Sequence, residues 1–72
     1  MANSEAINQL QRGDNVLFKY IDDEDGDSTK IAVVLDVNTN RISFKDIDGK
    51  FEFTKKYLIN TNSIEMEIIE ES

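Results

Sequence analysis

The residues best suited to chemistry lie in one short acidic stretch. Five carboxylates occur within six consecutive positions, at Asp22, Asp23, Glu24, Asp25 and Asp27. Carboxylate oxygens bind Ca²⁺, and a calcium loop of the EF-hand type needs ligands at positions 1, 3, 5 and 12, with Gly at position 6. When Gly26 is set at position 6, positions 1 and 12 fall on Ile21 and Ala32, which have no ligand atoms in their side chains. The sequence therefore excludes an EF-hand, and we assign no metal ligands.

The acidic stretch carries more charge than a turn requires. A solvated hairpin loop accounts for Gly26 and one or two aspartates, because these residues favour turns. A weak cation site between Asp23, Asp25 and Asp27 is a second interpretation. The third is an acidic contact that steers the chain toward a basic protein surface. We adopt the third as our hypothesis, with Asp22, Asp23, Glu24, Asp25 and Asp27 as the steering surface and Tyr20 and Tyr57 as exposed anchors.

Catalytic residue combinations are missing from the sequence. The chain has no His and no Cys, so its Ser and Thr residues lack the usual partner base. Its carboxylates fall in predicted exposed loops, where burial cannot tune their pKa values. Three glycines do not form a phosphate-binding loop. We therefore expect a non-catalytic protein that uses no cofactor.

Length and charge narrow the class further. The 72 residues predict one domain spanning the whole chain, and self-association would help so small a core. The net charge of −7 argues against direct binding to nucleic acid or anionic lipid. No segment resembles a signal peptide or a membrane span, so a cytoplasmic location is expected.

The hydrophobic pattern predicts one short helix followed by strands. Ala6, Ile7 and Leu10 form one apolar stripe over about 4–12, with Asn3 or Ser4 as the cap. After Gly13, period-two alternation predicts five strands, at about 14–21, 30–37, 41–46, 51–54 and 64–69.

Two short segments connect the later strands. Asp48-Gly49 is a hairpin signal, and centring the turn there would pair Lys45 with Glu52 across the strands. Lys55-Lys56-Tyr57-Leu58 breaks the alternation and predicts a single helical turn.

Short strands joined by hairpins favour a small barrel, because curling the sheet protects its edges. We predict a mainly β fold, a five-stranded SH3-like barrel with a short N-terminal α-helix across one open end.

Several segments resemble the Tudor branch of the SH3-like barrels. Gly13-Asp14 is similar to the opening of those domains, Ala32-Val33-Val34 to their central strand, and Phe44–Gly49 to their apolar-x-Asp-Tyr-Gly segment. The resemblance covers about 13–60 and implies a non-catalytic binding module. Tudor domains that read methylated Lys or Arg use an aromatic cage. Here Ile47 stands where the cage Tyr would be and most aromatic residues are expected in the core, so methyl-lysine binding is not carried over.

Three functional hypotheses follow. The first is an acidic protein-interaction module for a basic partner. The second is a phage-type inhibitor that imitates nucleic acid, which requires 22–27 and the four glutamates of 65–71 to lie together. The third is a ring subunit that binds RNA, because a helix followed by five strands is also similar to the Sm/Hfq arrangement. Its basic contact would be Lys55-Lys56-Tyr57.

Overall fold

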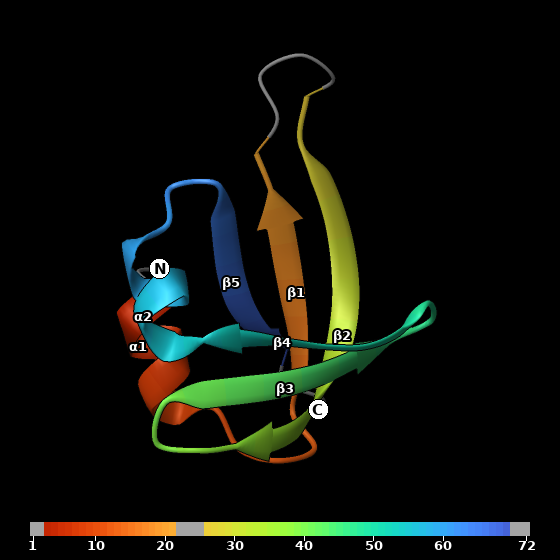
Figure 1. The fold of residues 1–72 in the computed structure, drawn as a ribbon. Helices are drawn as coiled ribbons and strands as arrows, with labels where there is room; N and C mark the ends of the chain where they lie inside the picture. Colours follow the sequence, from red (N-terminus) through yellow and green to blue (C-terminus); the bar gives the residue numbers. More distant parts are fainter. Residues whose placement is uncertain (1–2, 22–25, 70–72) are drawn as a thin grey trace.

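The protein is mainly β in a computed structural model that describes residues 3–21 and 26–69 (Figure 1). Its elements are α1 (Asn3–Gln9), β1 (Asn15–Tyr20), β2 (Ser28–Val37), β3 (Arg41–Asp46), β4 (Gly49–Thr54), α2 (Lys55–Asn60) and β5 (Ile64–Ile69). The five predicted strands, the N-terminal helix and the helical turn before the last strand are confirmed. The ends differ: α1 ends at Gln9, and β2 and β4 each begin two residues earlier than predicted. Neither helix in the described ranges has the length and apolar character needed to cross a membrane.

The strands form one antiparallel sheet in the order β4-β3-β2-β1-β5. The long central strand β2 pairs with β1 through its first part and with β3 through its second part. The pairing register shifts between Val34 and Asp36, a bulge that helps bend the strand. Figure 1 shows β3 and β4 running across β1. The sheet wraps around its core without closing, because β4 and β5 are its two edges.

The core fills the concave side of this curved sheet. Phe18 and Phe44 are fully buried, and their ring centroids lie 4.9 Å apart with an edge-to-face angle of 84°. The predicted stripe of α1 is buried as expected, and Leu58 of α2 joins it. The two helices lie side by side over one end of the core, where α1 also contacts β5 (Figure 1).

Asn3 joins the two ends of the chain instead of acting as a simple helix cap. Its Nδ2 donates to the carbonyl oxygens of Leu58 and Ile64, both at 2.8 Å, and its Oδ1 accepts from the backbone N–H of Met66 at 3.1 Å. The side-chain amide therefore bonds to alternate residues of β5, as the backbone of a neighbouring strand would. This arrangement fixes α1 against an edge of the sheet.

The predicted pairing of Lys45 with Glu52 is wrong. Lys45 lies opposite Lys50, whereas Glu52 lies opposite Ser43 and accepts from Nη1 of Arg41 at 3.0 Å. The whole hairpin is shifted relative to a turn centred on Asp48-Gly49.

The side chain of Asp46 explains this register. Its Oδ1 accepts from the backbone N–H groups of Asp48 at 2.8 Å and of Gly49 at 3.1 Å. Asp46 pairs with Gly49, so Ile47 and Asp48 become the two central residues of the turn. Positive φ then falls on Gly49, at 133°, and on no non-glycine residue of the described ranges. The glycine is thus used one position later in the turn than the sequence signal suggests.

Candidate protein-interaction site

Four partly exposed aromatic rings lie on or near the edge strand β4: two come from β4 itself, one from α2 and one from β1. We call Tyr20, Phe51, Phe53 and Tyr57 the aromatic row. The rings of Phe51 and Phe53 are 5.6 Å apart, and that of Phe53 stacks on Tyr57 at 5.5 Å with an angle of 17°. Tyr20, Phe51 and Phe53 pack against the core but are only partly buried, whereas Tyr57 is 47% exposed. Of the six aromatic side chains, only Phe18 and Phe44 are fully buried.

Local structure positions three of the four rings of the row. Phe51 and Phe53 alternate along β4 with exposed polar residues, so both rings face the concave side. At the start of α2, Oγ1 of Thr54 accepts from the backbone N–H of Tyr57 at 3.1 Å. The N–H of Thr61 bonds to the carbonyl of Tyr57 at 2.9 Å and completes the short helix. A shallow hollow beside Tyr57 is lined by Thr54, Lys56, Asn60 and Thr61.

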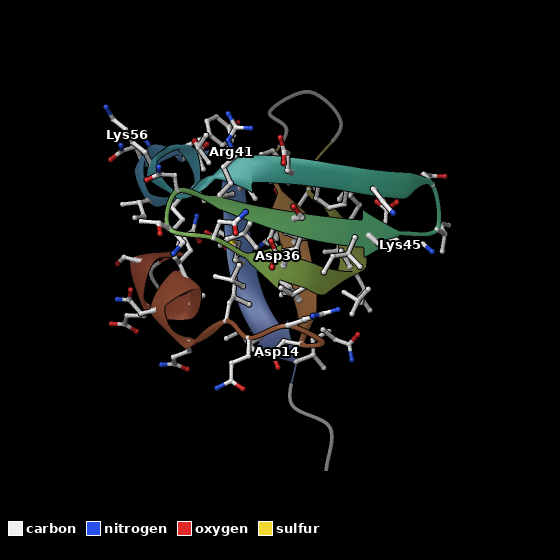
Figure 2. The ribbon with its side chains drawn as sticks, turned by 60° about the horizontal axis from the view of Figure 1, so that its bottom comes forward. Asp14, Asp36, Arg41, Lys45 and Lys56 are labelled. Carbon is white, nitrogen blue, oxygen red and sulfur yellow. The ribbon has the colours of Figure 1, made fainter. Side chains whose placement is uncertain are left out.

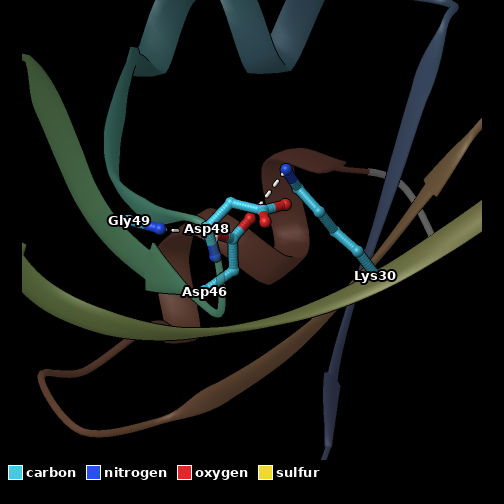
Figure 3. Close-up of polar contacts among 4 residues, drawn as sticks. All are labelled: Lys30, Asp46, Asp48 and Gly49. Carbon is cyan, nitrogen blue, oxygen red and sulfur yellow. Dashed lines mark hydrogen bonds and ion pairs between the residues drawn. The ribbon is translucent and has the colours of Figure 1, made fainter.

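Lys30 of β2 lies at the other end of the row. Its Nζ is 4.7 Å from the ring centroid of Phe51 and 5.6 Å from that of Tyr20. The same Nζ lies 2.7 Å from Oδ2 of Asp46, whose side chain is only 5% exposed (Figure 3). The ammonium group is therefore held by two aromatic rings and one carboxylate from three different strands.

The contacts of this pair shift both pKa values. The hydrogen bond from Lys30, followed by those from the backbone N–H groups of Asp48 and Gly49, lowers the pKa of the Asp46 carboxyl. The hydrogen bond to Asp46 raises the pKa of Lys30, although burial acts in the opposite direction. Both shifts favour the charged forms, so the ion pair persists around neutral pH.

The predicted site residues fall into three groups. Asp22, Asp23, Glu24 and Asp25 lie outside the described residues. Asp27 is described, and its Oδ2 lies 3.2 Å from Nζ of Lys19, with both side chains about half exposed. Tyr57 is exposed as predicted, whereas Tyr20 is partly buried and has Lys30 over its ring. Because Tyr20 pairs with Ser28, the acidic sequence connects two strand ends beside this part of the row.

Sequence reasoning missed Phe51, Phe53, Lys30 and Asp46 as site residues. The two phenylalanines show the alternation of a core strand, and the sequence does not reveal that β4 is an edge strand. Lys30 and Asp46 come from neighbouring strands and are brought together by the β2–β3 pairing, so no local spacing in the sequence connects them. The Asp-Ile-Asp-Gly turn was a usable signal, because Asp often accepts from backbone N–H groups two residues ahead.

The positions of the described acidic residues bear on two alternative interpretations, the weak cation site and the nucleic-acid mimic. No three acidic side chains of residues 3–21 and 26–69 gather as metal ligands would, and Asp23 and Asp25 fall outside those ranges. The β1–β5 register puts Glu65 opposite Lys19. The ammonium group of Lys19 also forms an ion pair with Asp27. A lysine therefore separates the described members of the two acidic groups, where a nucleic-acid mimic would need continuous negative charge.

Charges of both signs are interspersed outside the aromatic row. Figure 2 shows Asp36, Arg41 and Lys45 distributed over β2 and β3, and Lys56 projecting from α2. These labelled side chains form no single-sign patch.

Comparisons with models of protein families, with curated proteins and with solved structures give no match. The residues of the site themselves are therefore the basis for a functional assignment.

Proposed function

We propose that the chain is a non-catalytic protein-interaction module that binds a basic surface of a protein partner. The observation that carries this proposal is the aromatic row along β4, which lies on an edge of the sheet. Partly exposed aromatic rings held by packed elements are typical energetic centres of protein interfaces. Their faces also attract Lys and Arg side chains.

Charge supplies the second part of the proposal. The acidic sequence 22–27 joins the strand that ends at Tyr20 to the strand that carries Lys30. Negative charge at that end of the row would attract a basic partner and raise the rate of encounter. The rings would then provide the apolar contact area. A cytoplasmic location and the Tudor-like relationship belong to the same proposal.

A matched pair of variants in α2 tests the role of the row. Tyr57 and Ile59 have almost equal exposures, 47% and 49%, but only Tyr57 stacks on Phe53. Side chains two positions apart in a helix point in nearly opposite directions, so Tyr57 and Ile59 face different surroundings. We expect Tyr57→Ala to weaken binding of a short Lys/Arg peptide several-fold, as measured by NMR titration, and Ile59→Ala to leave it unchanged. Equal losses in the two variants would contradict the proposal.

The acidic stretch requires its own variant. Replacing Asp22, Asp23, Asp25 and Asp27 together by Asn should slow association with the peptide and reduce its dependence on salt. Titration with oligouridine tests for RNA binding and should produce no shifts in the NMR signals of the row. If the peptide perturbs only β5, or if oligouridine binds as well as the peptide, the proposed partner class is wrong.

A further inference from the structure

At one end of the aromatic row is a cation site that the chain fills itself. Its walls are the rings of Tyr20 and Phe51 and the carboxylate of Asp46, contributed by β1, β4 and β3. Lys30 of β2 fills it with its ammonium group. We infer that Lys30 is an internal competitor, which occupies the place that a basic side chain of the partner takes when it binds. This inference rests on the proposed function and adds a means of control to it.

The walls of the site are held independently of Lys30. Asp46 is fixed by two backbone N–H donors from its own turn, at 2.8 and 3.1 Å. The ring of Phe51 packs on Phe18 at 5.8 Å and on Phe44 at 5.4 Å, and Tyr20 lies 6.3 Å from Phe18. Phe18 and Phe44 are fully buried, so they provide a rigid base. The site therefore keeps its shape when the lysine leaves, and a preorganised site binds a new cation at less cost.

Lys30 itself is the replaceable part. Its side chain is 39% exposed, whereas that of Asp46 is 5% exposed, so solvent reaches the ammonium but scarcely reaches the carboxylate. A lysine stem has several rotatable bonds and can swing outward without moving β2. An incoming guanidinium can contact the carboxylate through two N–H groups and stack on a ring, which one ammonium cannot do.

Competition within the chain lowers the apparent affinity for the partner. If the site is open in about a tenth of molecules, the apparent dissociation constant rises about tenfold. Removal of the competing ammonium should therefore strengthen binding, which is the opposite of what loss of an ordinary contact residue does. This reversal of sign distinguishes an internal competitor from a residue of the interface.

The test uses Lys30→Met, which keeps the length of the stem, and methylguanidinium as the probe. Ring protons of Tyr20 and Phe51 report binding by NMR. We expect an affinity about tenfold higher in Lys30→Met than in the wild type. Lys45→Met is the matched control, because it makes the same change in net charge at an exposed residue of β3 whose side chain lies on the opposite face from that of Asp46. Equal affinity in the two variants overturns the inference.

Two further measurements make the result decisive. In Lys30→Met combined with Asp46→Asn, the gained affinity should disappear. In the wild type, which needs no variant to fold, saturating methylguanidinium should shift the ammonium signal of Lys30 toward that of a free lysine. Binding in the row without that shift also overturns the inference. If Lys30→Met gains nothing while Tyr57→Ala still weakens the Lys/Arg peptide, only the competitor fails. The reverse pattern leaves a cation site occupied by Lys30 but removes the proposed function and, with it, the role of Lys30 as a competitor of the partner.

Discussion

At the scale of single residues, Asp46 has two roles that use its two carboxylate oxygens separately. Oδ1 accepts from the backbone of its own turn, and Oδ2 pairs with Lys30 of another strand. One residue thereby sets the register of a hairpin and fixes an ammonium group against the aromatic row. The ammonium group of Lys30 pairs with this carboxylate and lies over the rings of Tyr20 and Phe51.

The pKa shifts predict how stability responds to acid. The folded-state pKa of Asp46 lies below the ordinary value of 3.8, so its contribution is fully present above that value. The contribution is lost as the pH falls through the lower folded-state pKa. Lys30 behaves in the opposite direction: its contribution is fully present below 10.5 and is lost as the pH rises through the raised folded-state pKa. Between these limits the pair is expected to give constant stabilisation.

Urea denaturation of the wild type and of Lys30→Met between neutral pH and about pH 2 checks this prediction. The wild type should be more stable at neutral pH, and the difference should shrink once Asp46 is protonated. By NMR, the carboxyl of Asp46 should titrate at higher pH in Lys30→Met than in the wild type, while Lys56→Met should match the wild type. A difference in stability that stays constant through the acid range would show that the ion pair contributes nothing.

At the scale of elements, the β3–β4 hairpin shows what a sequence signal specifies. Asp48-Gly49 correctly marks the hairpin, and the glycine is required. The signal does not specify which residues are central, because Asp46 offers an acceptor that moves the turn toward the N-terminus by one residue. The cross-strand pairs change as a result, and Lys45 faces Lys50 instead of Glu52.

Gly49→Ala should destabilise the protein by about 1–3 kcal/mol, because the residue has φ of 133° and an L-residue is strained there. No heavy atom lies within 4 Å of the added Cβ, so the cost is confined to the backbone. Thermal and urea denaturation measure the loss. A chemically synthesised chain with D-alanine at position 49 is the control and should recover most of the stability. If the L and D variants are equally unstable, the strain argument is wrong.

At the scale of the whole molecule, Asn3 links the start of the chain to α2 and β5. Its three hydrogen bonds join residues 55 to 63 positions apart in the sequence. The side-chain amide occupies part of the β5 edge, so this edge is partly protected from pairing with another chain. The β4 edge carries Phe51 and Phe53 of the aromatic row instead. The two edges of the sheet therefore differ: a side-chain amide occupies part of the β5 edge, whereas the β4 edge carries aromatic rings.

Asn3→Ala should cost about 1–3 kcal/mol of unfolding free energy, because the N–H of Met66 and two carbonyl groups lose their partners in a partly buried place. Asn62→Ala, at an exposed turn position, is the matched control and should change stability by less than about 0.5 kcal/mol. Hydrogen exchange gives a site-specific reading: the Met66 amide should exchange faster in Asn3→Ala only. Unchanged exchange at Met66 would contradict the proposed link.

The sequence by itself determined the elements and most of the core. Period-two alternation located the five strands, and the stripe Ala6, Ile7 and Leu10 located the buried face of α1, because burial on one face leaves a local periodic trace. Phe18 and Phe44 could be placed in the core for the same reason. The excess of carboxylates at 22–27 was also visible, and its role as a partner contact stays a prediction.

Only the tertiary structure decided which strands are edges and which side chains meet. The strand order leaves β4 at an edge, so Phe51 and Phe53 are partly exposed although their pattern is that of a core strand. The β2–β3 pairing brings Lys30 to Asp46, and the ammonium group of Lys30 also lies over two rings that come from β1 and β4. The physical reason is that local periodicity records which face of a strand is buried, whereas edges and ion pairs depend on contacts between segments distant in the sequence.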